Sequence, residues 1–315
     1  MNPDSTTRPA ISVVCPLFNE QANVKELHER ILKSLKKTGR SFEIIFVNDG
    51  STDGTQTKCL KLSPLILINF RKNFGQTAAL DCGIKKAKGK IILTLDGDLQ
   101  NDPADFPRLI AKLEQGYDVV SGWRKKRRDP FSKKIISRGA DFLRKFLIND
   151  GIHDSGCTLK AYRRKCFSDV DLFGEMHRFI PAILKIQGFE VSEVEVVHHP
   201  RKNGQTKYNW TRTVKGFLDM ISVWFWKKYA NRPLHLFGSM GIFLSSLGFM
   251  LMIALLVLRL FYGIALSDKI WPMIAVFLIL AGLQLLISGL MADIAVKNYY
   301  NGQRKNYSIK SIEKI

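Results

Sequence analysis

The sequence predicts an α/β protein with a mainly parallel sheet, followed by a pair of membrane-spanning helices. Two observations support this fold class. Short apolar runs alternate with longer amphipathic segments over residues 11–198, which is the pattern of β-α units in a parallel sheet. Residues 236–258 and 270–292 then form two stretches of 23 residues without a charge. Each stretch is long enough, at about 1.5 Å per residue, to cross a hydrocarbon core of about 30 Å.

The first half of the chain contains four strands that alternate with three helices. Residues 11–15 form a short apolar strand that Pro16 stops, and a charged amphipathic helix follows over 21–37. Because such units cross over right-handedly, their strands should be parallel and their carboxyl ends should share one edge of the sheet. The further strands are expected at 42–47, 65–70 and 91–95, and the further helices at 54–62 and 76–88.

The second half contains fewer elements and a basic loop. After Pro103 a helix leads to a strand at 117–121, which the run of five cations at 124–128 follows closely. Such a run is usually a solvated surface, but beside an acidic loop its arginines would also suit bidentate contacts to phosphate. The remaining elements are expected at 158–162 (strand), 177–187 (a helix packed over the site) and 190–198 (strand).

Four domains follow from these patterns. We place the α/β domain at residues 1–210. Residues 211–232 carry apolar side chains at helical spacing, with charges on the opposite face and tryptophans near the end, which predicts an amphipathic helix at the membrane interface. The segment 233–297 holds two transmembrane helices, at about 234–260 and 270–294, and residues 298–315 form a basic cytoplasmic tail.

Charge and composition narrow the functional classes. The 315 residues carry a net charge of +20, and 46% of them are hydrophobic, which suffices for a sizeable core. Many basic residues lie near the apolar stretches, where they suit anionic lipid headgroups. No module of interleaved aromatic and basic residues stands out, so we expect no nucleic-acid partner. The five cysteines show no Cys-x-x-Cys spacing, which predicts reduced core residues of a cytosolic domain.

The distribution of charge also predicts the topology. Residues 1–9 are polar and lack the apolar core of a signal peptide, so the N-terminus should stay in the cytoplasm. Lysines and arginines flank the outer ends of the two stretches, whereas the connection 262–269 carries little net charge. By the positive-inside rule, both termini and the α/β domain are cytoplasmic, in a protein of the cytoplasmic membrane with two spans.

Two carboxylates end the fourth predicted strand. Asp96 and Asp98 are separated only by Gly97, at the C-terminal tip of the apolar run 91–95. Ligands of open parallel sheets bind at this edge, so the two acids can share one hard divalent cation, as Asp-x-Asp pairs that hold a metal-bound diphosphate do. The plainer alternative is that Asp96 ends the strand and Asp98 caps the next helix.

Three other loops favour a shared cation site over a strand end and a helix cap, because these loops follow the other parallel strands. They span residues 16–20, 48–53 and 71–75. Asp49 is placed to accept hydrogen bonds from a nucleoside base or ribose, and Glu20 from ribose hydroxyls. Taken alone, Asn48-Asp49-Gly50-Ser51 is an ordinary turn sequence. Four such loops at the ends of four strands indicate one ligand crevice.

Together these motifs resemble the family 2 inverting glycosyltransferases of GT-A fold, a Rossmann-like and mainly parallel sheet. The resemblance is specifically to the membrane-bound dolichyl-phosphate mannose synthase type, which includes bacterial polyprenyl-phosphate glucosyl and aminoarabinosyl transferases. It spans nearly the whole chain and says little about the sugar. The matching segments are 16–20, 47–53, 71–75, 96–100, 154–157 and 204–208.

The resemblance implies roles for individual residues. The nucleoside would be held by Pro16, Glu20 and Asp49. The Mg²⁺ or Mn²⁺ ion and the donor diphosphate would be served by Asp96, Asp98 and Gln100. The phosphates would be held by Arg124 for the donor, Arg128 at the reacting centre, and Arg201 and Lys207 for the acceptor.

Two departures from the family pattern stand out. The metal motif more often reads Asp-Ala-Asp, so Gly97 would make this loop somewhat more flexible. The second span ends in Gly289-Leu290-Met291-Ala292-Asp293, where some relatives carry Gly-Glu. The identity of the sugar that those relatives use is therefore not carried over to this protein.

The implied enzyme moves a hexose-type sugar from a nucleotide-diphospho-sugar, with UDP-sugars favoured, to undecaprenyl or dolichyl phosphate with inversion. The product would be a lipid-linked sugar donor for cell-envelope glycan or protein modification. Because the acceptor phosphate is already anionic at pH 7, little is required of a general base, and Asp154 would orient the acceptor or receive a residual proton. The expected partners are both substrates and the membrane, and the spans offer a surface for a homo-oligomer.

Three alternatives stay open at this point. One is a GDP-mannose-dependent polyprenyl-phosphate mannose synthase. Another is a processive polysaccharide synthase, which would need more spans and a Gln-x-x-Arg-Trp motif that this sequence does not contain. The third is a non-catalytic membrane scaffold, against which the acids at each strand end argue.

Overall fold

The computed structural model describes residues 8–125, 151–168, 170–172, 174, 176–200, 224–225, 229, 233–263, 265, 269–301 and 309–314. The chain divides into two compact units. One comprises residues 1–223 and 305–315, and the other comprises residues 224–304. The predicted interfacial helix, 211–232, lies almost entirely outside the described residues, so it stays a prediction.

The first unit is built on one eight-stranded sheet in the order β7-β5-β6-β4-β1-β2-β3-β8. The four strands from the first half of the chain pair in parallel, as predicted, and β5 pairs in parallel with β7. Strand β6 is antiparallel to both of its neighbours, so the sheet is mixed. The strands are β1 (Ile11–Leu17), β2 (Phe42–Asn48), β3 (Ile66–Phe70), β4 (Ile91–Thr94), β5 (Val119–Trp123), β6 (Lys160–Arg163), β7 (Val191–Glu195) and β8 (Ile309–Lys314).

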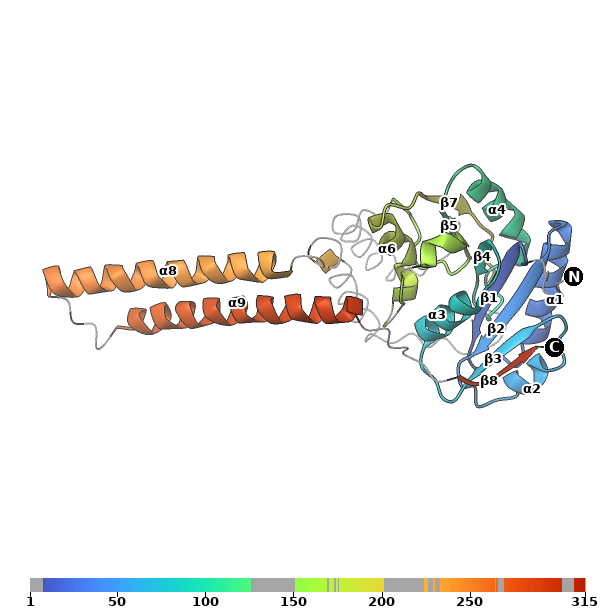
Figure 1. Ribbon diagram of the computed structural model, residues 1–315, viewed down its shortest axis with the longest axis horizontal. Helices are drawn as coiled ribbons and strands as arrows, with labels where there is room; N and C mark the ends of the chain where they lie inside the picture. Colours follow the sequence, from blue (N-terminus) through green and yellow to red (C-terminus); the bar gives the residue numbers. More distant parts are fainter. Residues whose placement is uncertain are drawn as a thin grey trace, which may run out of the picture. The chain divides into compact units, whose positions relative to one another are not determined.

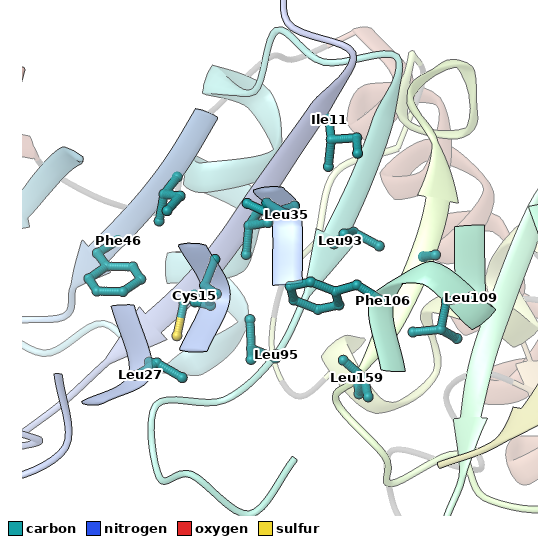
Figure 2. Close-up of a cluster of buried hydrophobic side chains, with 14 of the residues drawn as sticks. Ile11, Cys15, Leu27, Leu35, Phe46, Leu93, Leu95, Phe106, Leu109 and Leu159 are labelled. Carbon is teal, nitrogen blue, oxygen red and sulfur yellow. The ribbon is translucent and has the colours of Figure 1, made fainter. Parts of the chain in front are cut away.

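Helices cover both faces of this sheet (Figure 1), which explains why its central strands β1, β2 and β4 are almost entirely apolar. The helix α1 places Leu27, Ile31 and Leu35 against one face. Figure 2 shows Leu27 and Leu35 in the same cluster as Phe46 and Phe106. The helices α3 and α6 contribute buried side chains to a second hydrophobic cluster, on the other face of the sheet. The helices of this unit are α1 (Val24–Lys37), α2 (Thr55–Cys59), α3 (Gln76–Lys86), α4 (Phe106–Glu114) and α6 (Ile180–Ile186).

Pro16 does not stop the first strand, contrary to the prediction. Strand β1 continues to Leu17, and Pro16 lies in register with Val47 of β2. The carbonyl of Val14 accepts from the N–H of Leu95, so Val14, and Pro16 two residues later, direct their backbone groups toward β4. The pairing of β1 with β4 ends at Val14. The missing N–H of Pro16 therefore removes no ladder hydrogen bond.

The C-terminal residues are not a free tail. We expected a basic tail over 298–315, but residues 309–314 form β8, which pairs antiparallel with β3 at the edge of the sheet. Figure 1 shows this strand, in red, beside β3. The segment carries three charges in six residues, a composition typical of solvent-exposed chain. An edge strand can carry such charges because one of its sides faces no further strand.

The second unit contains α8 (Pro233–Tyr262) and α9 (Trp271–Asn301). Both are long and apolar enough to cross a membrane, by length and composition. They lie side by side as a hairpin (Figure 1). A Cβ atom on Gly241 would lie 2.6 Å from the carbonyl oxygen of Gly282, and one on Gly248 would lie 2.8 Å from that of Ala275. Small residues thus allow the close backbone approach that is typical of paired transmembrane helices.

Candidate active site

The structure brings the four predicted loops together at the carboxyl ends of β1, β2, β3 and β4. Backbone and side-chain hydrogen bonds join the first two loops: the N–H of Asn19 donates to Ser51 Oγ (2.9 Å), and the N–H of Thr52 donates to Asn19 Oδ1 (2.9 Å). Asn19 adopts a left-handed conformation, with φ of 57°, which its short polar side chain tolerates. The loops after β1 and β2 are therefore one hydrogen-bonded unit.

Asp49 joins the second loop to the third. One carboxylate oxygen accepts from the N–H of Phe74 (2.7 Å) and the other from the N–H of Gly75 (2.9 Å). Asp49 is only 3% exposed, and this burial raises the pKa of its carboxyl group more than the hydrogen bonds from the two N–H groups lower it. The carboxylate fixes the position of the 71–75 loop, and its predicted contact with a nucleoside stays a prediction.

Glu20 and Pro16 lie at the same edge. Glu20 Oε2 accepts from Asn23 Nδ2 (2.6 Å), and the N–H of Glu20 donates to Thr55 Oγ1 (2.9 Å). These contacts tie the end of the first loop to the beginnings of α1 and α2. The side chain of Glu20 is thus held at the beginning of α1, and its backbone at the beginning of α2.

The acidic pair follows β4 as predicted. Asp98 is 6% exposed, and its Oδ1 accepts from the N–H of Gln100 (3.2 Å). Asp96 Oδ1 accepts from Gln76 Nε2 (2.6 Å), a contact that the sequence interpretation missed. The available signal was the position of Gln76, which begins α3 directly after the 71–75 loop.

Gly97 is explained by close packing and not by flexibility. A Cβ atom at this position would lie 2.5 Å from Leu17 Cδ2 and 3.4 Å from Glu20 Cγ. The loop after β4 thus passes directly against the end of β1, and an alanine here would require Leu17 to move. This packing brings the acidic pair next to the loop that holds Glu20.

The acidic pair suits a hard divalent cation. Desolvation, and next the charge of Asp98, raise the pKa of Asp96 to about 7, because two neighbouring carboxylates resist ionising together. Among the described residues, no group of three or more His, Cys, Asp and Glu side chains is placed to hold an ion. Two carboxylates fit Mg²⁺ or Mn²⁺ when a substrate diphosphate and water complete the coordination.

Arg124 and Asp154 form a two-point ion pair beside this edge. Arg124 Nε lies 2.6 Å from Asp154 Oδ2, and Arg124 Nη2 lies 2.8 Å from Asp154 Oδ1. Their side chains are 11% and 16% exposed. Burial raises the pKa of Asp154, but the hydrogen bonds and charge of Arg124 outweigh it and leave that pKa below its usual 3.8. Asp154 is therefore ionised and already paired, which makes it a weak proton acceptor.

Lys160 is a second residue that the sequence interpretation missed. It is 2% exposed and donates to the carbonyl of Ser155 (3.2 Å). Its charge acts on Asp96 and Asp154, and burial lowers the pKa of Lys160 itself. The signal was a lysine between two apolar residues, Leu159 and Ala161, of a predicted strand. Two basic side chains, Arg124 and Lys160, thus lie next to the carboxylates of Asp96 and Asp154.

The other predicted cations lie outside the described residues. They are Arg128, Arg201 and Lys207. Their roles stay predictions.

The fold and the site together define a glycosyltransferase of GT-A fold. The chain belongs to the family described as Glycosyl transferase family 2, which residues 12–171 match. This confirms the family and the fold class that the motifs implied. A solved structure of similar fold is glucosyl-3-phosphoglycerate synthase from Mycobacterium tuberculosis in complex with Mn²⁺, UDP and glucosyl-3-phosphoglycerate. It superimposes with a TM-score of 0.55 at 18% identity, over 70% of this chain and 80% of that one.

Two similar relatives extend over almost the whole chain. Dodecaprenyl-phosphate galacturonate synthase from Rhizobium johnstonii is 38% identical over 312 residues, which cover 96% of this chain and 92% of the relative. Undecaprenyl-phosphate 4-deoxy-4-formamido-L-arabinose transferase from Proteus mirabilis is 31% identical over 309 residues, covering 96% and 93%. The likeness therefore extends beyond the GT-A domain into the two apolar helices.

Proposed function

We propose that this protein transfers a hexose-type sugar from a nucleotide-diphospho-sugar, with UDP-sugars favoured, to a polyprenyl phosphate. The observation that carries the proposal is the likeness to two polyprenyl-phosphate sugar transferases over 96% of the chain, apolar helices included. The acids at the strand ends support catalysis over a scaffold role. The two relatives are named for different sugars, so the sugar is left to experiment.

A divalent cation fits this site, and Asp96, Asp98 and Gln100 would hold it. When bound, it would supply charge that stabilises the departing diphosphate. Solved relatives of the fold were crystallised with Mn²⁺ and UDP, which agrees with this proposal. We propose Mg²⁺ or Mn²⁺ as the cofactor.

The reaction we propose is a single displacement. An anionic oxygen of the lipid phosphate attacks the anomeric carbon from the side opposite the leaving group, the bond from that carbon to the diphosphate oxygen breaks, and the configuration inverts. No proton leaves the acceptor, which agrees with the pairing of Asp154 to Arg124. Glu20 and Asp49 would orient the nucleoside, while Arg128, Arg201 and Lys207 would hold phosphates.

A transfer assay tests this function. Purified full-length protein in liposomes with undecaprenyl phosphate would receive a panel of radiolabelled UDP- and GDP-sugars with Mg²⁺ or Mn²⁺. We expect one UDP-sugar to transfer its label into the organic phase only when the lipid phosphate is present. Transfer from GDP-mannose alone would favour a mannose synthase, and absence of transfer from the whole panel would contradict the proposal.

Cation binding should depend on pH. Protonated Asp96 cannot ligate a cation, and its pKa of about 7 means that protons compete below neutrality. The affinity for Mn²⁺ in the presence of UDP should therefore fall about tenfold from about pH 8 to about pH 6. Calorimetric titration at each pH measures it. In the Asp96→Asn variant the dependence should disappear, and a pH-independent affinity in the wild type would contradict the assignment.

The topology can be tested by cysteine labelling. All five native cysteines are buried, so a cysteine introduced at Ser267, in the connection between α8 and α9, should be the main reactive thiol. We expect a membrane-impermeant maleimide to label it from outside intact cells, because the positive-inside rule places both termini in the cytoplasm. Labelling only after the cells are opened would show the reverse orientation.

A further inference from the structure

The C-terminal strand reaches the loop that follows β2 through side chains. Asn48 is in register with Asn69 on β3, and Asn69 is in register with Ser311 on β8. These three side chains therefore stand in one row across the edge of the sheet, at the end where the predicted donor loops begin. Asn48 and Asn69 are 3% and 1% exposed.

A continuous series of hydrogen bonds runs along this row. The N–H of Ser51 donates to Asn48 Oδ1 (3.1 Å), and Asn48 Nδ2 donates to Asn69 Oδ1 (2.9 Å). Asn69 Nδ2 donates in turn to Ser311 Oγ (3.2 Å), whose hydroxyl donates to Glu313 Oε1 (3.1 Å). Every donor points the same way along the series, so each bond polarises the next.

The loop at the other end is the one that carries Asp49. Ser51 Oγ also accepts from the N–H of Asn19, and Asp49 holds the N–H groups of Phe74 and Gly75. A displacement of Asn48 would therefore reach three of the four loops at this edge. The backbone pairing of β3 with β8 does not by itself position Asn48. It fixes the strand but leaves the rotamer of the Asn69 amide free.

We propose that Ser311 is a positioning residue for the nucleotide-binding loop, acting through Asn69 and Asn48. The proposal rests on the proposed function, since it takes the loop at 48–53 as the nucleoside site. It also gives the C-terminal strand a role beyond covering the sheet edge. In the sequence β8 follows α9, so the residue that positions the loop comes from the part of the chain after both apolar helices.

Replacing Ser311 by Ala would leave the buried Nδ2 of Asn69 without its acceptor, which favours rotation of that amide and loosening of Asn48. Ser311→Thr retains the hydroxyl and suits a strand, so it should restore the wild-type behaviour. The matched control is Ile312→Ala on the same strand, because Ile312 is 49% exposed and is not part of the series.

The experiment compares these full-length variants by amide hydrogen exchange and by binding of UDP with Mn²⁺. In Ser311→Ala we expect faster exchange in peptides covering residues 48–54 and a dissociation constant raised roughly three- to tenfold. Ser311→Thr and Ile312→Ala should match the wild type in both readouts. Thermal melts separate these changes from a general loss of stability.

Two outcomes would overturn the proposal. One is unchanged exchange at 48–54 in Ser311→Ala, and the other is an equal effect in Ile312→Ala, which would reduce β8 to an edge cover. The exchange measurement needs no ligand. If the wild type binds no UDP, the nucleoside site is wrong, while the exchange result still decides whether Ser311 positions the loop.

Discussion

Replacing Asp98 by Asn is expected to lower the rate of sugar transfer about a thousandfold, equivalent to about 4 kcal/mol of transition-state stabilisation. The amide keeps the size of the side chain and removes the charge that would hold a cation against the departing diphosphate. Asp98 is buried beside Asp96, so solvent cannot replace that charge. The measurement is the initial rate at saturating donor and lipid acceptor.

Asp171→Asn is the matched control, because Asp171 pairs with Lys85 at the surface and, among the described residues, no hydrogen bond or ion pair joins it to the site loops. It should retain the wild-type rate. Both variants should show wild-type thermal melts, since Asn can still accept the hydrogen bond from the N–H of Gln100. An Asp98→Asn enzyme that keeps more than about a tenth of the activity with an unchanged metal requirement would exclude Asp98 as a ligand.

Replacing Arg124 by Met is expected to lower the free energy of unfolding by about 3 kcal/mol, because Asp154 would remain ionised and unpaired in a largely buried position. Chemical denaturation of the full-length protein in detergent measures it. The difference in the free energy of unfolding between the wild type and the variant should shrink as the pH falls, since protonation of Asp154 removes the unpaired charge. A deficit that is constant with pH would show that lost packing, and not charge, is responsible.

Asp154→Asn separates this structural role from base catalysis. The pKa of Asp154 lies below its usual value, so at neutral pH the carboxylate has little tendency to take a proton. We expect a loss of transfer much smaller than in Asp98→Asn, because the lipid phosphate has no proton to surrender. If Asp154→Asn is as inactive as Asp98→Asn while still binding UDP, Asp154 is catalytic in its own right.

The parallel part of the fold was predictable because each strand is a short apolar run that ends in polar turn residues. Strand β4 and its two acids illustrate this, since hydrophobic burial and the loop chemistry agree there. The prediction was wrong for residues 309–314, where a charged segment forms β8 only because β3 offers an unpaired edge. That pairing spans more than two hundred residues of sequence and leaves no local periodic signal.

The sequence predicted which residues lie in the site better than it predicted the contacts between them. Asp49, Asp96 and Asp98 lie at strand ends, where topology alone brings them together. The pairing of Arg124 with Asp154, the contact of Gln76 with Asp96 and the burial of Lys160 depend on side-chain geometry across separate elements. Gly97 looked like added flexibility because its packing partner, Leu17, is eighty positions away in the sequence.

The most direct test of the central claim is nuclear magnetic resonance of the purified lipid product. Direct attack by the lipid phosphate on the anomeric carbon predicts a single ³¹P resonance of a phosphodiester. It also predicts an anomeric coupling constant that shows the configuration opposite to that of the donor. Two coupled ³¹P resonances would reveal a diphosphate linkage and hence transfer of a sugar phosphate. A retained anomeric configuration would equally contradict the single displacement.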